Sequence, residues 1–240
     1  MIEHLLLLPT FAETGTPNVF NYFAQSNAAG KVIVMLLIIF SLIAWTIMIG
    51  KYMDLRRMDD LNRAFEDRLM RGTSILDQEQ PQSQTIPYNV LFHEAVEAFR
   101  RAENPDARDP ETGKRLQISH MENALQRGVT RKSADYEARM VFLASIVTGA
   151  PFLGLLGTVW GVMDAFGAVA LRSTATLQML APGVSGALLT TVAGLLVAIP
   201  SVFGYNILLT QTKNMITALE NFASTLADQI EMESKEEWGD

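Results

Sequence analysis

The residues that could do chemistry here lie inside two long apolar stretches. Thr158 and Asp164 fall within residues 140–171, where Asp164 is the only charged residue. Thr191 falls within residues 173–212, which carry no charge at all. A carboxylate in hydrocarbon is costly unless it is paired, protonated or close to water, and such groups commonly mark the path of an ion or a proton. These three residues are therefore the first candidates for function.

Both threonines stand in the middle of a stripe of small residues. Each stripe follows the spacing of one helical face. In lipid, small residues let helices approach closely, and hydroxyl groups can form hydrogen bonds between them. The stripes predict tight packing for the glycines and alanines, and leave two interpretations for the threonines: packing, or a polar patch that faces a cavity. The stripes are Gly154, Thr158, Gly161, Ala165 and Ala168, and Ala187, Thr191, Gly194, Ala198 and Ser201.

Asp164 also has two interpretations. It can belong to an ion or proton path, or it can be hydrated at the outer end of its span, since Leu171 and Arg172 follow about two helical turns later. Two prolines lie in the later apolar stretch. Pro182 is predicted to open the helix, where its missing N–H costs little, and Pro200 to bend it.

The elements that must position these residues are three charge-poor runs, each long enough to cross a bilayer. The predicted fold class is an all-α integral membrane protein with long cytoplasmic helical extensions. Residues 51–139 hold 15 of the 19 basic residues, so the positive-inside rule places this segment in the cytoplasm and the N-terminus outside. The predicted segments are 1–30 (short periplasmic segment), 31–51 (first span), 52–139 (cytoplasmic helical domain), 140–171 (second span), 172–177 (periplasmic loop), 178–208 (third span) and 209–240 (cytoplasmic C-terminal helix).

Within the predicted cytoplasmic segment, one helix should stop near Gly72 and a second should cover about residues 88–103. Residues 104–113 are rich in Pro, Gly and Asp and predict a loop. From about residue 114 a helix is expected to run without a break into the second span. The acidic start of the chain is unlike a cleavable signal peptide, so the first span is expected to act as the anchor.

Composition argues against several classes of protein. A net charge of −7 without a basic cluster argues against a nucleic-acid partner. The absence of cysteine excludes disulfides and thiolate chemistry. No phosphate-binding loop or zinc-protease motif is present, and the three histidines are scattered, so no enzyme activity, cofactor or metal is predicted.

The segments "PFLGLLGTVWGVMDAFGAVA" and "ATLQMLAPGVSGALLTTVAGLLVAIPSVFGYN" resemble the TolQ/ExbB group of proton-channel motor subunits, which is more distantly related to the MotA flagellar stator. The resemblance is dense over residues 150–206, and the three-span architecture extends it to the whole chain. The motif "TLQMLAPG" and the short N-terminal segment are most similar to TolQ members, with ExbB members next.

The resemblance implies a homopentameric ring whose second and third spans line a central pore. The pore would hold two copies of a TolR/ExbD-like single-span partner, which carries the aspartate that binds and releases protons. A TolA/TonB-like periplasm-spanning protein would receive the work, and the ring would lie in the bacterial inner membrane. The two pore threonines of the family correspond to Thr158 and Thr191. The predicted pore-lining set is Thr158, Thr190, Thr191 and Asp164, and the predicted packing set is Gly154, Gly157, Gly161, Pro182, Gly183, Gly186, Gly194 and Pro200.

One position departs from the family pattern. Where the family carries Pro-Gly-Ile-Ala-Glu-Ala-Leu, this sequence has "PGVSGAL", so the family glutamate falls on Gly186. Asp164 stands where the most similar relatives carry histidine or asparagine. Helical rise places Asp164 and Gly186 at similar depths if Thr158 and Thr191 are level. The hypothesis is that the carboxylate has moved from the third span to the second, and that Gly186 leaves room for it.

Other functions remain open at this stage. Within the family, an ExbB-like role in outer-membrane uptake is the alternative to a TolQ-like role. Outside it, a small-solute transporter or a non-conducting scaffold is possible, although three spans without an inverted repeat offer little to bind a solute. The absence of additional polar ligands favours H⁺ over Na⁺ as the coupling ion.

Overall fold

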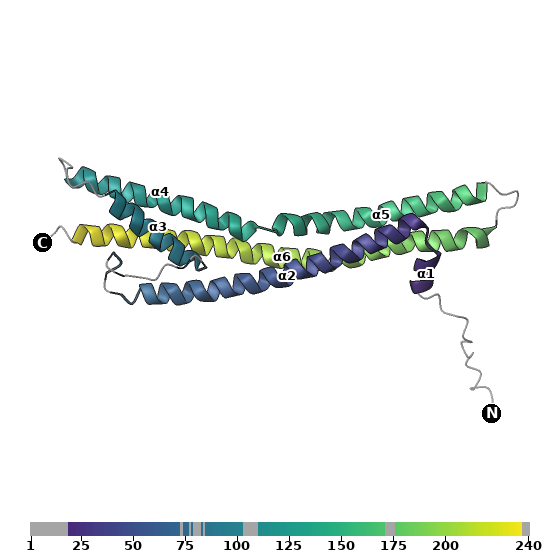
Figure 1. Cartoon of the computed structure of the whole chain (residues 1–240), viewed down its shortest axis with the longest axis horizontal. Coiled ribbons are helices and arrows are strands. Elements are labelled where there is room, and N and C mark those ends of the chain that lie inside the picture. The colour runs from purple at the N-terminus through teal and green to yellow at the C-terminus, as the bar shows by residue number, and fades with distance from the viewer. Residues whose placement is uncertain are drawn as a thin grey trace, which may run out of the picture. The chain divides into compact units, whose positions relative to one another are not determined.

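The computed structural model describes residues 19–72, 74–76, 78, 83, 85–102, 110–170 and 176–236. These residues form helices and short connections and contain no strand, which confirms the predicted all-α class (Figure 1). The helices are α1 (Val19–Gln25), α2 (Ala28–Leu69), α3 (Pro87–Arg101), α4 (Pro110–Glu137), α5 (Met140–Ala170) and α6 (Leu177–Glu236).

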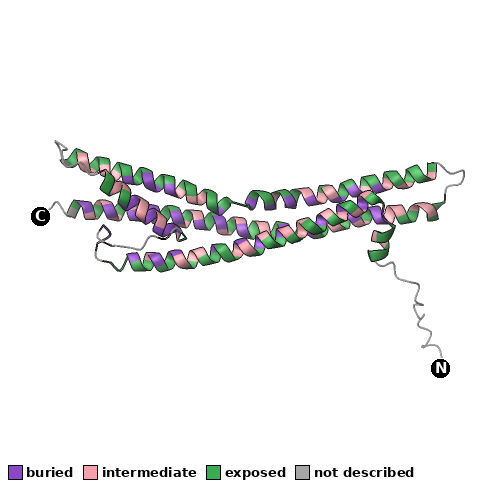
Figure 2. Cartoon of the chain, viewed as in Figure 1, coloured by how far each residue is buried: buried purple, intermediate pink, exposed green. Residues whose placement is uncertain are grey.

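Three segments of the described chain are long and apolar enough to cross a membrane, as predicted. They are Ala28–Leu69, Glu111–Ala170 and Leu177–Lys235. Their most apolar windows are only 17%, 33% and 39% buried, and exposed residues run along all three (Figure 2). Large exposed apolar surfaces in a soluble monomer would be a liability. Here they are the surfaces that lipid or other membrane chains must cover.

The chain divides into two compact units. The first comprises Met1–Trp45 and Ala144–Val202, and the second comprises Thr46–Leu143 and Phe203–Asp240. Helices α2 and α6 contribute residues to both units.

In the first unit, α5 and α6 approach so closely that several glycines have no room for a side chain. A Cβ atom added to Gly194 would lie 2.6 Å from the Ala150 carbonyl oxygen and 3.2 Å from the Cα atom of Gly154. A Cβ atom on Gly154 would lie 2.8 Å from the Thr190 carbonyl oxygen. These neighbours are backbone atoms, which cannot rotate away. Added Cβ atoms on Gly157, Gly161 and Gly183 would meet the side chains of Thr190, Ala187 and Ala165, respectively.

In the second unit, aromatic rings from α2, α3 and α6 form the centre of the core. Tyr88 stacks on Phe222 with ring centroids 4.0 Å apart, and Phe65 meets the edges of Phe92 and Phe222. The Tyr88 hydroxyl donates a hydrogen bond to the Ala218 carbonyl oxygen at 3.1 Å. Burial raises the pKa of Tyr88 to about 12.

The expectation of one uninterrupted helix from residue 114 into the second span is wrong. Helix α4 ends at Glu137 and α5 begins at Met140. Between them Arg139 has a φ angle of 70°, in the left-handed region that non-glycine residues rarely adopt. Residues 138–139 are alanine and arginine, so no glycine or proline marks the break in the sequence.

Several predicted boundaries also differ from the structure. The predicted loop over residues 104–113 is wrong in its second half, because residues 110–113 form the first turn of α4 with Pro110 at its first position. Residues 104–109, together with 1–18 and 171–175, lie outside the described part. The predicted segments 178–208 and 209–240 join in α6, which continues to Glu236.

Pro182 does not open the third spanning helix, as the sequence had suggested. Helix α6 begins at Leu177, so Pro182 lies in its second turn and removes the backbone donor that would bond to the Gln178 carbonyl. Pro200 removes the donor for the Leu196 carbonyl in the same way. The helix continues through both prolines.

Gly194→Ala should destabilise the first unit, because the new methyl group would meet the Ala150 carbonyl and force α5 and α6 apart. We expect the free energy of unfolding to fall by about 1–3 kcal/mol, the usual cost of overpacking. Thermal unfolding of the detergent-solubilised protein, followed by circular dichroism, measures this loss. Gly167→Ala on α5 is the matched control, because nothing lies within 4 Å of a Cβ atom added there. Equal melting temperatures for the two variants would contradict the packing described above.

Candidate functional site

Three threonine hydroxyls from two helices meet at one backbone carbonyl in the first unit. Thr158 lies on α5, and Thr190 and Thr191 lie on α6; we call these three residues the threonine cluster. The Gly154 carbonyl oxygen lies within hydrogen-bond distance of all three hydroxyls, at 3.2 Å from Thr158, 2.9 Å from Thr190 and 3.2 Å from Thr191. The hydroxyls of Thr158 and Thr191 are also in direct contact with each other.

The glycines make the threonine cluster possible. Because Gly154 and Gly157 have no side chains, the backbone of α6 comes close enough for its hydroxyls to reach a carbonyl on α5. A side chain at either position would occupy the space that Thr190 now fills. The two small-residue stripes are therefore in contact with each other, with the hydroxyls at their centre.

Exposure separates the members of the threonine cluster. Thr190 is completely buried, and its hydroxyl also donates to the Ala187 carbonyl at 2.6 Å. Thr158 and Thr191 are only half-buried. The expectation that Thr190 lines a pore therefore does not agree with the structure, because Thr190 faces the α5–α6 interface. Thr158 and Thr191 retain surface that a ligand or a partner could reach.

Asp164 is exposed and is held by a residue that sequence reasoning missed. The side-chain amide of Asn27 donates a hydrogen bond to Asp164 Oδ2 at 2.5 Å. The amide oxygen of the same Asn27 accepts a hydrogen bond from the Gly30 N–H at 2.7 Å. Asn27 directly precedes α2, so it is the N-cap of that helix, a position where asparagine is strongly preferred. One side chain thus caps α2 and joins it to α5.

The surroundings of Asp164 suit a carboxylate. Its hydrogen-bond donor is the N-cap of α2, and the N-terminus of a helix carries a partial positive charge that stabilises anions. Asp164 therefore has both a direct hydrogen-bond donor and a favourable helix dipole. Together they lower the cost of placing a carboxylate in an apolar stretch.

Gly186 does not leave open space for the carboxylate, contrary to the hypothesis drawn from sequence. A Cβ atom added to Gly186 would lie 2.9 Å from the Cα atom of Ser26, so Ser26 fills this space. Ser26 is only 6% exposed, and its hydroxyl has no hydrogen-bond partner among the described residues. Because Ser26 precedes Asn27, Gly186 and Asp164 contact adjacent residues. Gly186 makes room for the backbone that brings Asn27 to Asp164.

One signal in the sequence could have found Asn27. An asparagine immediately before a long apolar helix is a typical N-cap. The sequence could not show that the other end of its amide reaches a residue 137 positions later.

The fold and this site define a class of protein. It is an all-helical membrane protein in which hydroxyl groups cluster between two spanning helices and most of the surface of the apolar segments is exposed. The sequence model of the "MotA/TolQ/ExbB proton channel family" matches residues 93–221, more than half of the chain. The chain belongs to this family, which consists of proton channels and is not a class of enzymes.

Curated relatives agree with this assignment. The Tol-Pal system protein TolQ of Haemophilus influenzae is 34% identical over 199 residues, which cover 80% of this chain and 85% of the relative. TolQ of Pseudomonas aeruginosa is 28% identical over 217 residues, covering 86% and 92%. The biopolymer transport protein ExbB of Xanthomonas campestris is 34% identical over 152 residues, covering 63% of this chain and 59% of that relative.

Asn27→Ala should lower the stability of the first unit, because it removes both the cap of α2 and the donor to Asp164. We expect a loss of about 1–2 kcal/mol in the free energy of unfolding. The exchange of Asn27→Asp together with Asp164→Asn retains a good cap and a donor–acceptor pair, and should recover most of the loss. Melting temperatures of the solubilised variants measure both effects.

The control is Asn21→Ala, on the exposed surface of the short helix α1. If Asn27→Ala melts like Asn21→Ala, the contact with Asp164 contributes nothing to stability. If the exchanged pair melts no higher than Asn27→Ala, the link between the two positions is refuted.

Proposed function

We propose that this chain is the static inner-membrane subunit of a motor driven by the proton-motive force, with a TolQ-like task. The single observation that carries the proposal is the pair of half-buried hydroxyls, Thr158 and Thr191, held in contact on two spanning helices. They lie within the 93–221 match to a family of proton channels.

These hydroxyls are suited to a partner whose charge changes. A threonine hydroxyl can both donate and accept a hydrogen bond. It can therefore donate to an ionised carboxylate and accept from a protonated one. In the proposed mechanism, the aspartate of a TolR/ExbD-like helix contacts the Thr158–Thr191 pair of each subunit in turn. Proton binding and release then change which contact is preferred, and no covalent bond is made by this chain.

The proposed assembly is a homopentamer around two partner helices. The low burial of the apolar windows supports it, because surfaces left open by a single chain are available to neighbouring copies, a partner and lipid. Five equivalent sites around two helices would favour stepwise rotation. The work would pass through the partner to a TolA-like periplasm-spanning protein.

The proposed topology has the N-terminus in the periplasm and the C-terminus in the cytoplasm. The distribution of basic residues supports it, because residues 51–139 hold most of them and only Arg172 lies between the second and third spans.

A TolQ-like task, energising outer-membrane integrity and constriction, is preferred to an ExbB-like task. At the same coverage of 80% of this chain, TolQ of Haemophilus influenzae is 34% identical and ExbB of Neisseria meningitidis is 29% identical. The alternative remains an ExbB-like subunit that energises TonB-dependent uptake. In either case the proposed coupling ion is H⁺.

Asp164 is proposed as a polar group in the outer half of the proton path, at the place where relatives of the family carry other polar residues. Its bond to Asn27 gives a fixed position on the side of α5 that faces the start of α2.

Thr158→Ala and Thr191→Ala should each abolish motor function while assembly with the partner continues. Loss of one hydrogen bond to a charged group weakens an interaction about tenfold or more. Thr158→Ser and Thr191→Ser retain the hydroxyl and should retain much of the function. Survival of cells on detergent, which reports outer-membrane integrity, measures a TolQ-like task; growth on iron-siderophore complexes measures an ExbB-like task.

The matched control is Thr148→Ala on α5, because among the described residues the Thr148 hydroxyl bonds only to carbonyls of its own helix. If Thr158→Ala and Thr191→Ala behave like Thr148→Ala at equal membrane levels, the cluster serves packing alone and the proposed mechanism is wrong. A defect in siderophore uptake without a defect in detergent resistance would assign the chain to the ExbB-like task.

A further inference from the structure

The second unit contains a cavity of about 310 Å³ where α4 gives way to α5. Its walls come from α2, from the end of α4 and from the residues just before α3. Five of the lining residues are charged, and three of them are basic. The basic residues are Lys51, Lys132 and Arg139, and the acidic residues are Asp54 and Asp135.

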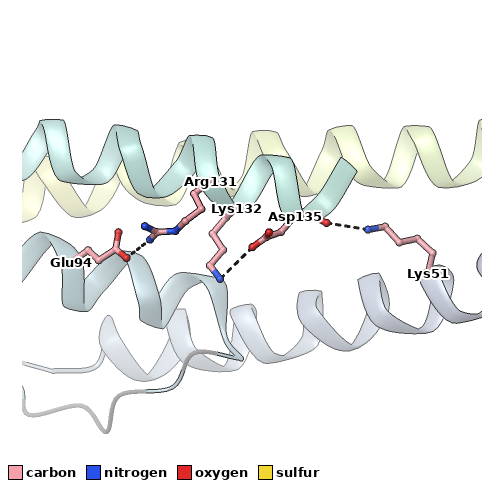
Figure 3. Close-up of polar contacts among 5 residues, drawn as sticks. All are labelled: Lys51, Glu94, Arg131, Lys132 and Asp135. Carbon is pink, nitrogen blue, oxygen red and sulfur yellow. Dashed lines mark hydrogen bonds and ion pairs between the residues drawn. The ribbon is translucent and has the colours of Figure 1, made fainter. Parts of the chain in front are cut away.

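Lys51 is the most unusual of these residues, because it is only 9% exposed. Its ammonium group donates one long hydrogen bond, 3.4 Å, to the backbone carbonyl of Asp135 (Figure 3). No ion pair joins Lys51 to a carboxylate of the described residues. The carboxylates of Asp54 and Asp135 attract Lys51 from a longer range, so its buried charge is only partly compensated. A partly compensated buried charge is destabilising. The cavity beside Lys51 is therefore a place where an anion would be stabilised.

Arg139 brings a second cation to the same cavity by means of an uncommon backbone conformation. Among the described residues, it is the only non-glycine residue with a positive φ angle. Such conformations are costly, and they cluster at binding and switch sites. At residue 139 the conformation produces the turn between α4 and α5 and places the arginine in the lining of the cavity. A guanidinium group presents a planar pair of donors that matches two oxygens of a phosphate.

The charges leave the cavity with an excess of one positive charge. Lys132 lies 3.6 Å from Asp135, so these two groups largely compensate each other (Figure 3). Asp54 offsets one of the two remaining cations, Lys51 and Arg139. A singly charged anion would bring the net charge of the cavity to zero, whereas a doubly charged anion would make it negative.

The position of the cavity along the chain indicates where such an anion would come from. Lys51 ends the charge-free run of residues 32–50, and Arg139 immediately precedes the apolar run that begins at Met140. Both residues therefore belong to the level at which apolar chain meets water. Basic pockets at this level on the cytoplasmic side are suited to lipid headgroups. Leu55 and Met58 add an apolar wall to the cavity.

We propose that the Lys51–Arg139 cavity binds a singly charged phosphate group, such as the phosphodiester of a phospholipid headgroup. Lys51 supplies a buried ammonium group, Arg139 supplies the planar pair of donors, and Lys132 compensates the charge of Asp135. The bound phosphate adds a directly paired counter-ion for Lys51 and Arg139, and so stabilises the turn between α4 and α5. Only the choice of leaflet depends on the topology proposed above.

The test measures the melting temperature of the full-length protein, purified in detergent. Three additives are compared: phosphatidylglycerol, diacylglycerol with the same acyl chains but no phosphate, and inorganic phosphate. We expect phosphatidylglycerol to raise the melting temperature and diacylglycerol to leave it unchanged. Arg139→Gln should weaken the response about tenfold or more in lipid concentration, because one charged donor is lost.

Lys51→Met separates binding from a purely structural role. Methionine has a similar length and carries no charge, so it removes the buried ammonium group. We expect this variant to melt at least as high as the unmodified protein without lipid, and to lose the response to phosphatidylglycerol. A lysine needed only for packing would instead give a lower melting temperature and an unchanged response.

Arg57→Gln is the matched control, because Arg57 is an exposed residue of α2 that does not line the cavity. Its response to phosphatidylglycerol should equal that of the unmodified protein. Phospholipid that remains bound through purification is counted by native mass spectrometry of the purified protein, and should be lower in Arg139→Gln than in Arg57→Gln.

A response to inorganic phosphate alone would support phosphate binding and refute the lipid as its source. The proposal is overturned if Lys51→Met and Arg139→Gln respond and retain lipid as Arg57→Gln does. It is also overturned if diacylglycerol stabilises the protein as well as phosphatidylglycerol.

Discussion

The contact between α5 and α6 is the constraint on which the rest of the first unit depends. At Gly154 and Gly194 the two backbones are so close that a methyl group would collide with backbone atoms. In hydrocarbon no water can satisfy a hydroxyl, so polar side chains must find partners within the protein. The close contact provides them, because the Gly154 carbonyl is within reach of all three threonines. The glycines thus allow the close approach of the helices, and the approach supplies the hydrogen-bond partners that the threonines need.

Much of this arrangement could be predicted from the sequence, because it depends on patterns within single helices. Charge-free runs identify the spans, and the spacing of small residues identifies which faces meet. The spacing of the stripe selected Thr191, but the sequence did not show that its neighbour Thr190, predicted to line the pore as well, is buried. About 100° of helix rotation separates them. That rotation places Thr190 entirely inside the α5–α6 interface and leaves Thr191 half-buried.

The features that the sequence did not reveal depend on contacts between distant segments or on unusual backbone. Asn27 lies in residues 1–30, which the sequence predicts to be a short periplasmic segment, and its bond to Asp164 joins α2 to α5. The turn at Arg139 has no glycine or proline to mark it, so helix propensity alone predicts a continuous helix there. At Arg139 the tertiary structure overrides the local helix propensity. At Asn27 a contact with a distant residue adds a role that no local pattern shows.

The double role of Asn27 limits how this region can change over generations. An asparagine can accept from the helix backbone and donate to a carboxylate at the same time. Serine could keep the cap but would no longer extend an amide to α5, and aspartate would place two carboxylates face to face unless residue 164 changed as well. Residues 27 and 164 should therefore vary together. A carboxylate at position 164 should be accompanied by an amide at position 27, and loss of one should be accompanied by loss of the other.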